Sequence, residues 1–192
     1  MIIKTKPEPG YADGALLLEA AHIHERLGEW DQALRAAEKA LAIYRDNDDQ
    51  RSTAVTQGQI ADILQACGEF DQALALHEWR LPVAQKLGDI EPIAVTRFKI
   101  ARICLQRGNQ GTDDMQRIHE ELAASLASFR KLGRQDGIGH VGVLLARVLA
   151  MRGQPDEALA VLDQAAAAFD KRGDTQGADQ ARRSGDRIRA DR

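Results

Sequence analysis

Apolar residues in this chain recur every three or four positions, which is the spacing of a helix that buries one face. Glycines interrupt the pattern regularly: Gly28 and Gly68 are 40 residues apart, Gly108 follows after another 40, and Gly153 after 45. Val and Ile rarely alternate with polar residues, as they would in a strand. The pattern therefore predicts paired helices, with a helix ending at each glycine because glycine adopts the left-handed cap conformation at low cost.

One small residue stands at the same place in every unit. An alanine precedes each turn glycine by seven residues: Ala21, Ala61, Ala101 and Ala146. Where two helices cross closely, only a small side chain lets their backbones approach. We therefore expect these four alanines to be buried at helix crossings.

The second helix of each unit is expected to begin at an aspartate and to end at a second polar loop. Asp31, Asp71 and Asp156 precede apolar runs, where a carboxylate can accept hydrogen bonds from unpaired backbone N–H groups. The closing loops are residues 45–49, 85–89, 130–134 and 170–174. The first of them has Asn47 and Asp48 where the others have glycine, and asparagine is the usual substitute in left-handed geometry.

Two segments depart from the period. The third unit has five additional residues around 111–116, which predict either a longer loop or an added helical turn. Residues 175–192 predict a polar helix of the kind that caps the end of a helical array. That helix is also locally basic, which leaves binding of an anion or a partner open; its arginines are Arg182, Arg183, Arg187, Arg189 and Arg192.

A small residue at the eighth position, glycine at the fifteenth and alanine near the twentieth resemble the tetratricopeptide repeat (TPR) family over roughly residues 12–174. The period of 40 departs from the 34 residues of the common form and resembles a longer-repeat subclass. Residues 60–89 are also similar to TPR arrays of bacterial multidomain proteins. The resemblance implies an all-α, right-handed α-solenoid of four TPR-like helix–turn–helix repeats and a C-terminal capping helix.

The expected domain organisation follows the loops. Residues 1–11 form an N-terminal extension, residues 12–174 form the array, and residues 175–192 form the capping helix. The four predicted repeats are 12–50, 51–90, 91–135 and 136–174.

Composition narrows the class of protein. The chain is 44% hydrophobic, 29% charged and 4% aromatic, which is typical of a folded, helix-rich protein. Its net charge of −3 gives no support to nucleic-acid binding. We expect neither a signal peptide nor a membrane span, and two cysteines, Cys67 and Cys104, are too few for a disulfide framework. These features together predict a cytoplasmic protein.

Several motifs resemble cofactor-binding or catalytic motifs but lack the neighbouring residues or elements that those functions need. Residues 137–142, GIGHVG, match G-x-G-x-x-G without the βαβ unit that a dinucleotide site needs. His77-Glu78 and His119-Glu120 begin like zinc-protease helices, but the second histidine is missing in both. We therefore expect no catalytic residue, metal or cofactor.

The first helices of the repeats are expected to line a concave groove. Arg102 and Arg147 are suited to hold a carboxylate of a partner, and Phe98 and Val143 to take an apolar side chain. A solvated wall without a ligand accounts for these residues equally well. The candidate partner-binding residues are His22, Gln59, Asp62, Gln65, Phe98, Lys99, Arg102, Gln106, Val143 and Arg147.

The sequence therefore predicts a non-enzymatic scaffold that binds a peptide or protein segment in this groove. The alternative is a self-associating structural or regulatory module of a larger bacterial signalling assembly. In that case the cluster Leu16, Leu17 and Leu18 packs end to end in a homodimer. Enzymatic function is the weakest of the three hypotheses.

Overall fold

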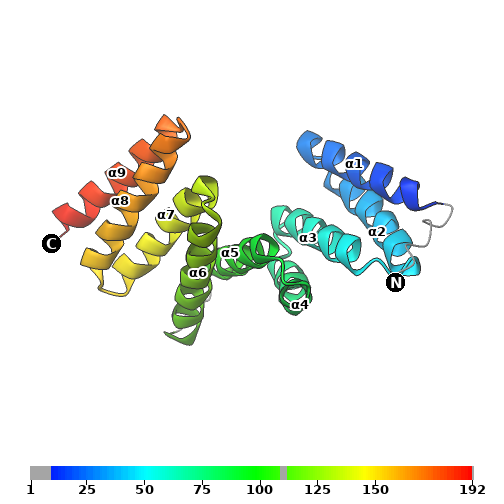
Figure 1. The fold of residues 1–192 in the computed structure, drawn as a ribbon, viewed down its shortest axis with the longest axis horizontal. Helices are drawn as coiled ribbons and strands as arrows, with labels where there is room; N and C mark the ends of the chain where they lie inside the picture. The colour runs from blue at the N-terminus through cyan, green and yellow to red at the C-terminus, as the bar shows by residue number, and fades with distance from the viewer. Residues whose placement is uncertain (1–9, 109–111, 192) are drawn as a thin grey trace. The chain divides into compact units, whose positions relative to one another are not determined.

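The computed structural model of the chain describes residues 10–108 and 112–191, and every regular element in these residues is an α-helix. The predicted all-α fold of helix–turn–helix pairs is confirmed (Figure 1). The predicted extension over residues 1–11 lies almost wholly outside the described residues, as does Arg192. The helices are α1 (Tyr11–Leu27), α2 (Trp30–Asp46), α3 (Gln50–Ala66), α4 (Phe70–Leu87), α5 (Ile90–Arg107), α6 (Thr112–Leu132), α7 (Gln135–Met151), α8 (Pro155–Lys171) and α9 (Thr175–Ala190).

The chain divides into two compact units, Met1–Lys86 and Leu87–Arg192. In the first unit, α1 packs on α2 and α2 on α3. In the second, α5 packs on α6, α6 on α7, α7 on α8 and α8 on α9. Helices thus pack on their neighbours in sequence, which is the packing of a TPR solenoid.

The turn glycines behave as predicted. Gly28, Gly68, Gly108 and Gly153 have φ angles of 75°, 84°, 78° and 74°, which lie in the left-handed region. A side chain at these positions would be strained, so glycine recurs wherever the first helix of a pair ends.

The loop that closes the first pair differs from the prediction in one residue. Asp48, with a φ of 52°, adopts the left-handed conformation, whereas Asn47 has a φ of −94°. The side-chain amide of Asn47 instead donates a hydrogen bond of 2.8 Å to the carbonyl of Ile43. Asn47 therefore satisfies a carbonyl at the end of α2, and the left-handed turn falls to the next residue.

The aspartates expected to start the second helices lie inside those helices. Asp31, Asp71 and Asp156 are in the first turns of α2, α4 and α8, where a carboxylate still interacts favourably with the helix dipole. The capping residues of α2 and α8 are Glu29 and Gln154, and neither makes a side-chain cap hydrogen bond. The predicted Asp31 and Asp156 caps are therefore wrong, because both helices begin at the preceding residue.

Aspartate caps occur instead at the start of α3, the first helix of the second pair, and of the C-terminal helix α9. Asp49 accepts a hydrogen bond of 3.0 Å from the backbone N–H of Ser52 at the start of α3. Asp174 accepts one of 2.8 Å from Gly177 at the start of α9. Both aspartates are the last residues of closing loops. The sequence pattern predicted that these loops end one helix, but not that they also cap the next.

The repeated alanines and the insertion both have clear structural outcomes. Ala21, Ala61, Ala101 and Ala146 are all 0% exposed, as expected for residues at helix crossings. The five additional residues of the third unit lengthen α6, which has 21 residues where α2 and α8 have 17. The insertion thus includes the added helical turn that was one of the two predicted alternatives.

Candidate functional site

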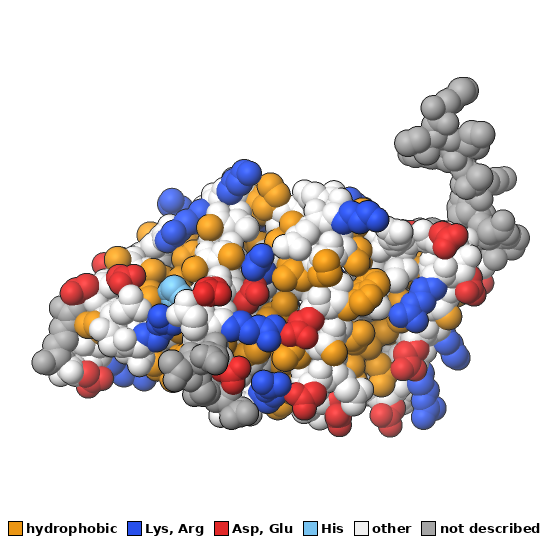
Figure 2. All heavy atoms as spheres, turned by 90° about the horizontal axis from the view of Figure 1, so that it is seen from below, with side chains coloured by type: hydrophobic (Ala, Val, Ile, Leu, Met, Phe, Trp, Pro, Cys, Tyr) orange, Lys and Arg blue, Asp and Glu red, His pale blue; other side chains and the backbone are white. Residues whose placement is uncertain are grey.

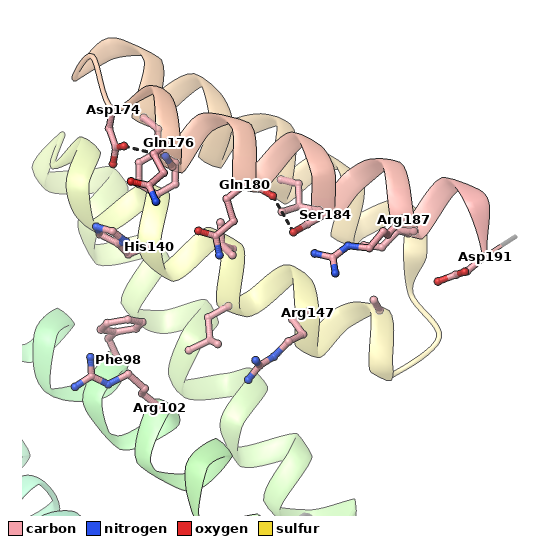
Figure 3. A pocket seen from close by; sticks show the side chains of 17 residues that line it. Phe98, Arg102, His140, Arg147, Asp174, Gln176, Gln180, Ser184, Arg187 and Asp191 are labelled. Atoms are coloured by element: carbon pink, nitrogen blue, oxygen red, sulfur yellow. Dashed lines mark hydrogen bonds between the residues drawn. The ribbon is translucent and has the colours of Figure 1, made fainter. Parts of the chain in front are cut away.

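A cavity of about 950 Å³ lies in the second unit between α5, α7 and α9. These are alternate helices of the array, and each contributes side chains that point into the same space (Figure 3). Phe98 and Arg102 come from α5, and Gln180 and Arg187 come from α9. The middle helix α7 contributes His140, Val143, Leu144 and Arg147.

Three arginines occupy equivalent positions of the repeat in this cavity. Arg102 and Arg147 each stand six residues before a turn glycine, and Arg187 follows Arg147 by the same period of 40 residues. Arg147 and Arg187 are exposed, and no acidic side chain among the described residues lies within ion-pair distance of either. The half-buried Arg102 lies over Phe98, with 5.8 Å between its guanidinium carbon and the ring centroid.

The apolar part of the cavity is organised around Phe169 of α8. This side chain is 2% exposed, and the His140 ring meets it edge-on with 5.1 Å between ring centroids. A Cβ atom added to Gly139 of α7 or to Gly177 of α9 would be 2.7 Å from the Phe169 ring. Both glycines therefore let their helices approach the aromatic ring closely.

Close helix packing of this kind also explains the GIGHVG motif. Its three glycines lie in α7, and a Cβ atom at Gly137 would be 2.3 Å from the ring of Phe129. At Gly142 it would be 3.0 Å from the Cβ atom of Ala165. The glycines serve helix packing, so the resemblance to a dinucleotide motif has a structural cause.

The polar wall of the cavity comes from α9. Gln176 and Gln180 are exposed, and the Ser184 hydroxyl donates a 2.9 Å hydrogen bond to the carbonyl of Gln180 (Figure 3). Asp174 and Asp191 line the cavity at the two ends of α9. The two carboxylates thus lie at opposite ends of α9, and that of Asp174 is already engaged in capping the helix.

The ten residues predicted from sequence fall into three groups. Phe98, Arg102, Val143 and Arg147 line this cavity together. Lys99 and Gln106 lie on α5 and are not among the residues that line the cavity. The other four belong to the first unit: His22 is exposed, Asp62 is half-buried, and Gln59 and Gln65 are 7% and 8% exposed.

Sequence reasoning missed the contribution of α9, which was interpreted mainly as a cap. The signal that identifies it is the period itself, since 40 residues beyond Arg147 the chain has Arg187. His140 and Phe169 were also missed, because nothing in the pattern distinguished them from other helical residues.

The first unit contains a buried polar cluster between α3 and α4. His77 is 0% exposed, and its Nε2 atom lies 3.9 Å from Oδ1 of Asp62. Burial lowers the pKa of Arg80, and the nearby Asp62 carboxylate partly opposes this shift. The corresponding positions of the first and fourth units are apolar: Ala37 and Leu162 for His77, and Ala40 and Ala165 for Arg80. His77 is thus a core residue in a polar version of the repeat.

The described residues also bear on other classes of function. Within residues 10–108 and 112–191, no three His, Cys, Asp or Glu side chains are grouped so that they could hold a metal ion. In those ranges no helix has the length and apolar character needed to cross a membrane. Cys67, at the end of α3, is exposed, and Cys104 is buried; both are free thiols. On the face shown in Figure 2, acidic and basic side chains are interspersed.

Comparison with known families agrees with this architecture. Two sequence profiles described as tetratricopeptide repeat match residues 13–86 and residues 139–164, which together are just over half of the chain. The chain is therefore a tetratricopeptide repeat protein. No curated protein sequence matches it significantly.

Solved structures share the fold at low sequence identity. A Rap conjugation gene regulator of the plasmid pLS20, in complex with the Phr* peptide, is 16% identical with a TM-score of 0.75; the match covers 94% of this chain and 47% of that one. Aspartyl phosphate phosphatase F from Bacillus subtilis is 11% identical with a TM-score of 0.81, over 91% and 45% of the two chains. A putative kinesin light chain from Podospora anserina is 20% identical with a TM-score of 0.68, over 96% and 98%. The chain thus spans about half the length of the first two proteins.

Proposed function

We propose that this protein is a non-enzymatic interaction module that binds a peptide segment in the cavity between α5, α7 and α9. The observation that carries the proposal is the series of arginines at one repeat position, two of which have no acidic partner among the residues that the structure describes. Unpaired guanidinium groups beside an apolar surface are suited to a ligand with carboxylates and an apolar side chain.

The chemistry of the walls defines the expected ligand further. Arg147 and Arg187 would each hold a carboxylate, from Asp, Glu or a chain terminus, by charge-assisted hydrogen bonds. Phe98 and Val143 would contact an apolar side chain of the same segment. The amides of Gln176 and Gln180 are positioned to pair with the backbone of an extended peptide.

The structural comparison supports a peptide as the class of ligand. The Rap regulator of pLS20 has a similar fold and was solved with a peptide. At 16% and 11% identity both similarities show the fold alone, so it is the exposed arginines beside an apolar surface that favour a peptide ligand over catalysis.

The test begins with selection of peptides from a random display library against the full chain. Selected peptides should be enriched in acidic and apolar residues. Arg147→Glu and Arg187→Glu should each weaken their binding about tenfold or more, because a charge-assisted contact becomes repulsive. Arg183→Glu is the matched control, since Arg183 is an exposed residue of α9 that does not line the cavity. Equal affinity for all three variants would refute the proposed site.

A further inference from the structure

The first helix has an exposed apolar stripe. Leu16, Ile23 and Leu27 are 69%, 50% and 67% exposed, and the half-buried Ala20 lies between them. Positions 16, 20, 23 and 27 are spaced by three and four residues and therefore lie on one face of α1. Leu17 and Leu18 are half-buried, so the exposed surface is this stripe and not the run of three leucines.

The repeat shows that part of this stripe occupies positions normally covered by another helix. In α7, the residues equivalent to Leu16, Ala20 and Ile23 are Val141, Leu145 and Val148, which are 1%, 5% and 0% exposed. In α3 they are Thr56, Ile60 and Ile63, which are 0%, 6% and 0% exposed. The helix α7 lies between α6 and α8, whereas within the described part of the first unit α1 packs substantially on α2 alone (Figure 1).

Leu27 distinguishes α1 from the other helices. Its equivalents Cys67, Arg107 and Arg152 are exposed, small or cationic residues, and the array gives no reason for leucine there. The additional leucine extends the stripe of α1 by one turn beyond the region that a preceding repeat would cover.

The stripe is complementary to itself in antiparallel orientation. With a two-fold axis between positions 21 and 22, Leu16 faces Leu27 of a second copy and Ala20 faces Ile23 of that copy. The small Ala20 lets two helices approach closely at the centre. Glu19 and Arg26 lie two turns apart on one flank, where each would meet its opposite charge on the second copy. Both are exposed, and neither forms an ion pair among the described residues.

We propose that α1 is a homodimerisation helix, with two copies packed antiparallel through Leu16, Ala20, Ile23 and Leu27. Contact through one helix buries less than the about 1,200–2,000 Å² of a standard interface, so the dimer is weak and depends on concentration. This surface is separate from the proposed peptide site, and either can fail without the other.

Sedimentation equilibrium of the full chain, from low micromolar to several hundred micromolar, tests the proposal. The wild type should pass from monomer to dimer, and Ile23→Glu should remain monomeric throughout. Val55→Glu is the control, since Val55 of α3 is also 50% exposed and lies outside the stripe. A monomeric wild type, or a dimer unaffected by Ile23→Glu, overturns the proposal.

Charge reversal tests the register. Glu19→Arg and Arg26→Glu should each weaken the dimer, and the double variant should restore it, because every copy then again presents one positive and one negative side chain. A double variant no stronger than either single variant contradicts the antiparallel arrangement. Circular dichroism of each variant confirms that the helices are retained.

Discussion

The guanidinium group of Arg80 on α4 occupies the space beside Gly58 on α3 where a side chain would begin. A Cβ atom added to Gly58 would lie 2.5 Å from Nη1 of Arg80. Glycine inside a helix costs about 1 kcal/mol relative to alanine, so its presence at position 58 needs a compensating reason. We infer that Arg80, at a position that the first and fourth repeats fill with the small Ala40 and Ala165, takes up the room that a side chain at position 58 would need.

A double-mutant cycle tests this relationship. Gly58→Ala in an Arg80→Ala background should stabilise the protein by about 1 kcal/mol, since the helix gains propensity and nothing opposes the new methyl group. In the wild-type background the clash with Arg80 should cancel much of that gain. Urea denaturation of the four proteins should give a coupling energy of about 0.5 kcal/mol or more. Additive effects would show that Arg80 does not require glycine.

The buried alanines predict a position-dependent response to a larger side chain. Ala146→Leu on α7 should cost about 1–3 kcal/mol, because that site is 0% exposed and additional atoms would overpack the helix crossing. Ala167→Leu on α8 is the matched control, since this alanine is exposed and lies one turn inside the C-terminal end of its helix. It should change the free energy of unfolding by no more than about 0.5 kcal/mol. Equal changes in melting temperature for the two variants would contradict the assignment of Ala146 to a helix crossing.

A third prediction concerns pH. Arg134 donates hydrogen bonds of 3.0 and 3.2 Å to Asp136, and these lower the pKa of the Asp136 carboxyl below its usual value. A lowered carboxyl pKa contributes stability above the usual aspartate pKa of about 4, and that contribution is lost as pH falls through the lowered value. Wild type should therefore exceed Asp136→Asn in stability at neutral pH, and the difference should shrink in acid.

The matched comparison for this prediction removes the donor. In an Arg134→Gln background, Asp136→Asn should have a smaller pH-dependent effect, because the Arg134 hydrogen bonds are the largest cause of the lowered pKa, while the Gly137 backbone N–H and the Arg172 charge remain. The measurement is urea denaturation at neutral and acidic pH. A difference between wild type and Asp136→Asn that does not depend on pH would contradict this account.

The fold was predictable because TPR packing places a recurring demand on a few positions. Gly28 must adopt a positive φ and Ala61 must let helices approach, so both residues are restricted by backbone geometry and the restriction is visible in the sequence. Helix starts were less predictable. Asp31 and Asp49 are both suitable capping residues, and only the backbone path shows that Asp49 caps a helix while Asp31 lies inside one.

The candidate site was predictable where it follows the period and not where it depends on tertiary contacts. Arg102 and Arg147 were found from their common offset to the turn glycines, and the same rule extended by one unit reaches Arg187. Gln65 was expected to be exposed beside the groove, but it is 8% exposed. The side chains packed around Gln65 determine how far it is buried. Its position relative to the turn glycine does not show which side chains those are.

Photo-crosslinking shows directly whether a peptide binds between α5, α7 and α9. A photoreactive phenylalanine analogue at Gln180 lies inside the cavity, and the same analogue at the exposed Ala167 of α8 lies outside its lining. With a peptide selected from the display library, we expect a crosslink from position 180 that excess unlabelled peptide suppresses, and none from position 167. Crosslinking from position 167, or none from position 180 at saturating peptide, would mean that the peptide binds elsewhere.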